Sequence, residues 1–116
     1  MNEEAESITS WRSQAAQIAR SIVAGEVGLL EGARDLAGIG PMLVHDTSAD
    51  PDFSVLVGVA SETDDMPFGG ARALWNPAAL AEKDRELSDY ECRVRDVVPE
   101  ACQSIWRRYV SNREDR

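Results

Sequence analysis

The densest group of chemically useful side chains is an acidic cluster, Glu62, Asp64 and Asp65, which places three carboxylates within four residues. Carboxylate oxygens are the ligands that Mg²⁺ and Ca²⁺ prefer in proteins, so these residues are candidates for a divalent-metal site. Acids at this spacing also occur in polar turns that only keep a loop solvated. Both interpretations of the cluster stay open at this point.

A calcium-binding EF-hand is excluded. A loop that begins at Asp50 has Val55 where the motif requires glycine and Ser61 where it requires a bidentate glutamate. A loop that begins at Asp46 fails at the same two positions. We therefore predict no metal, no cofactor and no catalytic residue, and we keep as an alternative an enzyme that holds a divalent ion on the acidic cluster.

The chain contains one histidine, His45, which lies beside Asp46. A His–Asp pair can act as a general base, but catalysis also needs a nucleophile that the histidine can activate. No nucleophile can be assigned to His45 from sequence spacing. We expect this side chain to be exposed or half-buried rather than catalytic.

The net charge of −9 is concentrated in the middle of the chain. Residues 35–71 contain no Lys or Arg and seven acids, so this window contributes −7 of the −9. A region of one sign repels nucleic acid and attracts basic surfaces, although it can also be a solvated face that only aids solubility. We predict that the window binds a basic protein partner through Asp46, Asp50, Asp52, Glu62, Asp64 and Asp65.

Arg72 is the first positive charge after this window. It follows the acidic cluster closely enough to close the loop with an internal ion pair. We predict a structural ion pair between Arg72 and at least one of Glu62, Asp64 and Asp65.

No feature of the sequence indicates export or membrane insertion. The chain begins with acidic residues where a signal peptide would be basic, and its apolar runs are too short to span a bilayer. Cys92 and Cys102 form no Cys-x-x-Cys pair, so we expect two buried thiols rather than a zinc site. The predicted location is the cytoplasm.

Apolar spacing predicts helices over residues 8–24 and 29–37. Residues 53–60 fit either a helix or a strand, and we favour a helix because Asp50-Pro51 is a typical helix start. Asn76-Pro77 is the strongest start signal in the chain, and it opens a long helix that Pro99 should kink or split. Phe68 and Trp75 are expected to pack inward from the loop before it.

The predicted fold is therefore all-α, with four to five helices around one core and residues 1–116 forming a single acidic domain. The long C-terminal helix is expected to supply the spine of that core. Its apolar stripe includes Leu87 and Trp106, which we predict to be buried.

A longer pattern resembles a group of small uncharacterised bacterial proteins. It consists of Ser-Glu-Thr-Asp-x-x-Pro-x-Gly from Ser61, then Arg72-x-x-Trp-x-Pro-x-x-Leu-x-x-Lys-Asp, and it also takes in Leu30-Glu-Gly-Ala-Arg. The resemblance covers about residues 18–106 and implies a small helical protein. It implies no activity.

Three classes of function follow from these features. The first is a binding protein that caps a basic partner, as an immunity protein caps a nuclease toxin. The second is a structural or regulatory subunit without a charge-driven partner. The third is a divalent-metal enzyme that uses the acidic cluster. Binding of nucleic acid or of a membrane is not expected, and the sequence does not indicate an oligomeric state.

Overall fold

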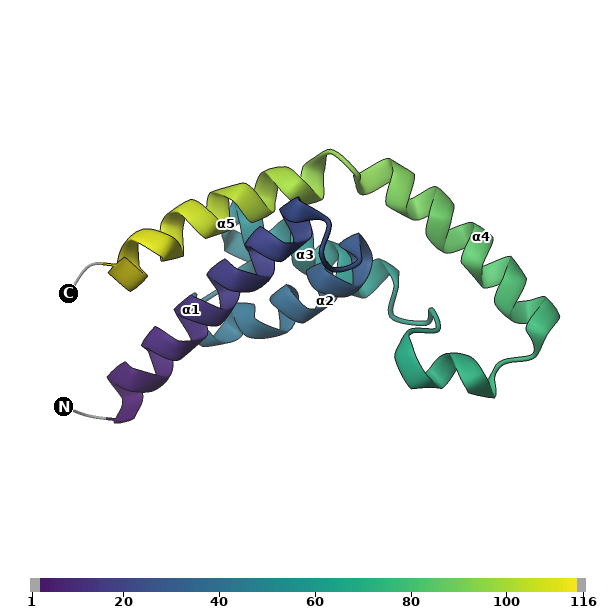
Figure 1. Cartoon of the computed structure of the whole chain (residues 1–116), viewed down its shortest axis with the longest axis horizontal. Coiled ribbons are helices and arrows are strands. Elements are labelled where there is room, and N and C mark those ends of the chain that lie inside the picture. Colours follow the sequence, from purple (N-terminus) through teal and green to yellow (C-terminus); the bar gives the residue numbers. More distant parts are fainter. Residues whose placement is uncertain (1–2, 115–116) are drawn as a thin grey trace.

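A computed structural model describes the backbone of residues 3–114 and the side chains of residues 8–110. The described chain is all-α, as predicted, and contains no strand (Figure 1). Its helices are α1 (Glu3–Ala24), α2 (Leu29–Ile39), α3 (Pro51–Glu62), α4 (Pro77–Val94) and α5 (Val97–Glu114). Three short 3₁₀ helices connect them, η1 (Gly40–Met42), η2 (Thr47–Ala49) and η3 (Gly69–Leu74).

Local capping explains where α3 and α4 begin. The Asp50 carboxylate accepts hydrogen bonds from the amides of Asp52 and Phe53, at 3.0 Å each. The Asn76 side chain accepts in the same way from the amides of Ala78 and Ala79. Each cap is followed by proline at the first helical position, where the missing N–H costs nothing. These caps confirm a helix, rather than a strand, over residues 53–60.

The C-terminal helix is split near Pro99, as the sequence predicts. α4 ends at Val94, residues 95 and 96 form a turn, and α5 restarts at Val97 with Pro99 in its first turn. Proline is tolerated there because amides in the first helical turn have no intrahelical partner. The split lets α4 and α5 leave the turn in different directions (Figure 1).

The core lies between α1, α2, α3 and α5. α1 packs along α5, α2 packs on α1 and α3, and α3 also packs on α5. α1 and α2 approach closely at Gly32, where an added Cβ would lie 2.5 Å from the Ile22 side chain. The largest fully buried side chains include Phe53, Leu36, Leu56 and Ile105.

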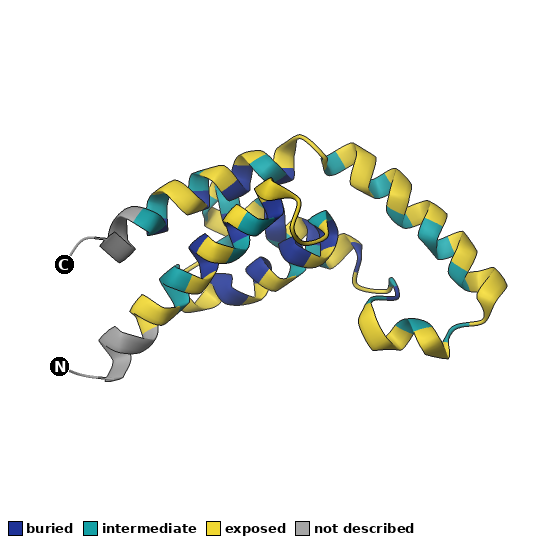
Figure 2. Cartoon of the chain, in the orientation of Figure 1, coloured by how far each residue is buried: buried dark blue, intermediate teal, exposed yellow. Residues whose placement is uncertain are grey.

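α4 adds no buried residue to this core, so the C-terminal spine that the sequence predicts is supplied by α5 alone. No residue of α4 is buried, and its half-buried stripe includes Leu87 and Tyr90 (Figure 2). The helix forms an arm, which gives the molecule principal extents of 53 × 28 × 26 Å. Among the helices of the described chain, none is long and apolar enough to cross a membrane.

Three side chains that the sequence predicts to be buried are half-buried or exposed. Leu87 is half-buried on the arm, Trp106 is 36% exposed, and Cys92 is exposed. The apolar stripe of α5 is already filled by Cys102, Ile105 and other buried neighbours, so the Trp106 ring falls at its edge. Cys102 is buried, as expected.

Candidate partner-binding groove

The acids predicted to bind a partner divide into two groups, and the first is internal. Asp50 and Asp52 at the start of α3 face Arg108 on α5, with oxygen–nitrogen distances of 2.9 and 2.8 Å. The Ser104 hydroxyl also donates to Asp52, at 2.7 Å. These carboxylates therefore join two core helices, and their contact with a partner stays a prediction.

Asp50 remains ionised in this setting. Partial burial opposes its charge, but the hydrogen bond from Arg108 and the two capping amides outweigh that penalty and lower the pKa of the carboxyl. Partial burial opposes the charge of Arg108, but its interactions with Asp50 and Tyr109 outweigh that penalty and raise the pKa of the guanidinium. The ion pairs of Asp50 and Asp52 with Arg108 therefore hold α3 and α5 together.

The second group is exposed and dispersed. Asp46 caps η2 by accepting from the Ser48 amide and hydroxyl. Glu62 is exposed at the end of α3, and Asp64 and Asp65 are exposed just after it. Asp65 approaches Lys83 of the arm at 3.7 Å. No group of His, Cys, Asp or Glu side chains that could hold a metal ion is found in the described part of the chain. His45 is exposed, as one of its two expected states.

Arg72 forms an ion pair, but its partner differs from the prediction. Its two terminal nitrogens bind the two oxygens of Asp84 on α4, both at 2.9 Å. The predicted partners lie nearer in sequence, but the η3 turn directs the guanidinium toward the arm instead. These bonds raise the pKa of Arg72 and lower that of Asp84. The pair ties the loop to the arm.

A second arginine holds the start of the same loop. Arg34 on α2 donates to the carbonyl and the hydroxyl oxygen of Thr63, both at 3.0 Å, and its guanidinium lies 4.5 Å from the centre of the Phe68 ring. Thr63 is fully buried and donates its own hydroxyl to the Val59 carbonyl at 2.7 Å. Arg34 and Thr63 both belong to the longer sequence pattern, and their contacts fix the start of the loop that leads to the arm.

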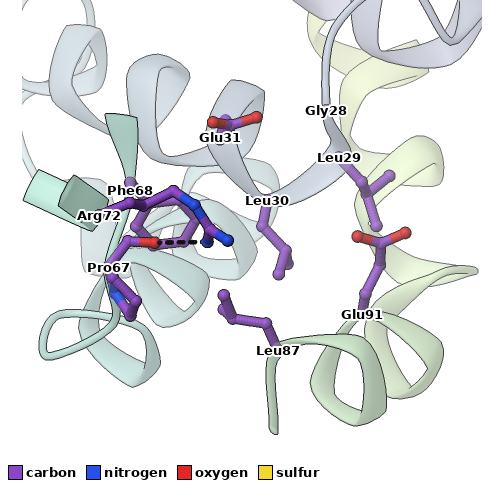
Figure 3. A pocket seen from close by; sticks show the side chains of 9 residues that line it. All are labelled: Gly28, Leu29, Leu30, Glu31, Pro67, Phe68, Arg72, Leu87 and Glu91. Atoms are coloured by element: carbon purple, nitrogen blue, oxygen red, sulfur yellow. Dashed lines mark hydrogen bonds between the residues drawn. The ribbon is translucent and has the colours of Figure 1, made fainter. Parts of the chain in front are cut away.

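The arm and the body enclose a groove of about 270 Å³ between α2, the loop and α4 (Figure 3). We call this the α2–α4 groove. α2, the loop and α4 each contribute apolar residues to its walls, which also carry three charged residues. The lining residues are Gly28, Leu29, Leu30, Glu31, Pro67, Phe68, Arg72, Leu87 and Glu91.

The charge balance in the α2–α4 groove is negative. Arg72 is neutralised by Asp84, whereas Glu31 and Glu91 form no ion pair with any described side chain. Glu31 lies close enough to Arg72 to add a smaller electrostatic attraction. Glu62 also acts on the arm. Burial of Tyr90 on α4 raises the pKa of its hydroxyl, and the negative charge of Glu62 adds to that rise.

This arrangement suits a cation with an apolar stem. A Lys or Arg side chain could lay its methylenes against Leu29, Leu30 and Leu87 and place its charge near a carboxylate. Sequence reasoning missed Glu31 and Glu91 because they lie outside the acid-only window. Nothing in the sequence marks these two residues as neighbours, because they line one groove only after the fold places α2 near α4.

Comparisons with known proteins give no relative. No protein-family model, no curated protein and no solved structure matches the chain.

Proposed function

We propose that this protein binds a basic protein partner by accepting a cationic, amphipathic segment in the α2–α4 groove. The observation that carries the proposal is the pairing of apolar walls with two unneutralised carboxylates, Glu31 and Glu91, in one concave site. Apolar area supplies affinity, and charge selects the partner and speeds its association.

The wider surface favours the same class of partner. The chain carries −9 overall, and Glu62, Asp64 and Asp65 add exposed negative charge beside the arm. A partner that approaches the groove would be steered by this field before it docks. An immunity-type inhibitor that caps a basic enzyme in the cytoplasm is the form of this function that we favour.

The experiment uses a blocked helical peptide with lysines on one face and leucines on the other. Isothermal titration calorimetry should show binding that weakens with added salt, because exposed charges are screened. The Glu31→Gln/Glu91→Gln variant should bind roughly tenfold more weakly, which corresponds to about 1.4 kcal/mol.

A matched control is Asp35→Asn/Asp46→Asn, which removes the same charge from exposed positions outside the groove. It should bind nearly as tightly as the native chain. Equal losses in both variants would show that net charge alone attracts the peptide, and the proposal of a groove would then be wrong.

A further inference from the structure

A second hollow lies on the outer surface between α1 and α5, away from the arm. It measures about 310 Å³ and is lined by Arg20, Val23, Gln103, Trp106 and Arg107. We call it the α1–α5 hollow. Val23 is 42% exposed and Trp106 is 36% exposed, so two large apolar side chains meet solvent side by side.

These apolar side chains are not explained by the core. The buried residues Cys102, Ile105 and Tyr109 already fill the face of α5 that packs inward. The Trp106 ring therefore lies outside the core and is partly exposed to solvent. Tryptophan, with tyrosine and arginine, is enriched among the residues that dominate binding at protein interfaces.

The charge of the α1–α5 hollow is opposite to that of the chain. Two arginines and no acid line it, in a protein of net charge −9. Neither Arg20 nor Arg107 pairs with a carboxylate among the described side chains, whereas Arg72, Arg85 and Arg108 all do. Two guanidinium groups that flank an apolar floor are thus left available to an anionic ligand.

We propose that the α1–α5 hollow binds an acidic protein segment that inserts one large apolar side chain beside Trp106. Arg20 and Arg107 would pair with carboxylates on either side of that anchor, and the ring and Val23 would cover it. An anionic membrane is disfavoured as the occupant, because the rest of the chain is strongly acidic and would be repelled from it. The site is independent of the α2–α4 groove.

The test uses a blocked helical peptide with glutamates on one face and leucines on the other, and a second peptide in which lysine replaces every glutamate. The indole N–H signal of Trp106, assigned with Trp106→Phe, is followed by NMR during each titration. We expect the acidic peptide to shift this signal and the lysine peptide to leave it unchanged. The Arg20→Glu/Arg107→Glu variant should bind the acidic peptide at least tenfold more weakly.

The control variant is Arg85→Glu/Arg95→Glu, which makes the same charge change on the arm and the adjoining turn. It should retain most of the affinity, and circular dichroism should show unchanged helix in both variants. An unmoved Trp106 signal or equal binding of both peptides would overturn the proposal. A Trp106 signal that shifts with protein concentration alone would also overturn it, because a second copy would then occupy the hollow. A signal that shifts only with phosphatidylserine vesicles would overturn it too, because the ligand would then be a membrane.

Discussion

At the scale of single residues, the two cysteines show how position rather than type decides chemistry. Cys92 is exposed on the arm, whereas Cys102 is buried in the core between α5 and its neighbours. Burial raises the pKa of the Cys102 thiol to about 12, with a smaller contribution from Asp52. A thiol with so high a pKa contains almost no thiolate at neutral pH.

Labelling with a thiol reagent at pH 8 should therefore modify one cysteine rapidly. Mass spectrometry of peptide fragments should place the label on Cys92, and Cys102 should react only after urea unfolds the chain. The Cys92→Ser variant serves as the control and should show no fast phase. Rapid labelling of Cys102 in the folded protein would contradict the position of α5.

The Asp50–Arg108 contact makes a prediction about acid stability. Because folding lowers the pKa of Asp50, its contribution is fully present above the unfolded pKa of about 3.9. That contribution is lost as the pH falls through the lower, folded pKa. Arg108→Met removes the partner, and hydrogen bonds to charged groups contribute about 1.5–3 kcal/mol, so we expect a loss of that order at pH 7.

Urea unfolding of both proteins between about pH 7 and pH 2 tests this expectation. The difference in unfolding free energy between the native chain and Arg108→Met should become smaller as the pH falls below the ordinary pKa of aspartate. A difference that stays constant across this range would show that Arg108 acts through packing and not through the ionised Asp50.

At the scale of elements, α5 offers a comparison between adjacent residues. Ile105 is fully buried and Trp106 lies at the edge of the helix interface. Ile105→Ala should cost about 2–5 kcal/mol because it leaves a cavity in the core. Trp106→Ala should cost less, about 1–2 kcal/mol, because part of the ring already faces solvent. Urea melts measure both values, and the reverse order would place Trp106 in the core.

The helices could be predicted from sequence because their signals are local. Asp50-Pro51 and Asn76-Pro77 cap the helices that follow them, and Pro99 marks the split before α5. The arm could not be predicted in this way. An apolar stripe such as that of Leu87 shows that one face avoids water, but not which element covers it.

The candidate site was less predictable for a related reason. Asp50 and Asp52 are adjacent to the exposed acids in sequence, yet they pair with Arg108 more than fifty residues away. The charge of a window cannot reveal such a partner. Likewise, Glu31 and Glu91 are unremarkable in sequence and become a pair only because α2 and α4 line one groove.

At the scale of the whole molecule, two surfaces of opposite charge lie on separate parts of the fold. The α2–α4 groove carries unneutralised carboxylates, and the α1–α5 hollow carries unpaired arginines within the described chain. α4 extends from the body and shapes only the first of them (Figure 1). Together, the two proposals predict that a basic and an acidic partner can bind at the same time.

The central claim is that the α2–α4 groove receives a basic segment, and mapping of backbone amide chemical shifts tests it most directly. During titration with the lysine–leucine peptide, the largest changes should gather at Gly28, Leu30, Phe68 and Leu87, on the three elements that enclose the groove. Changes centred on Asp46 and the neighbouring η2 helix, or spread evenly over the acidic surface, would contradict the claim.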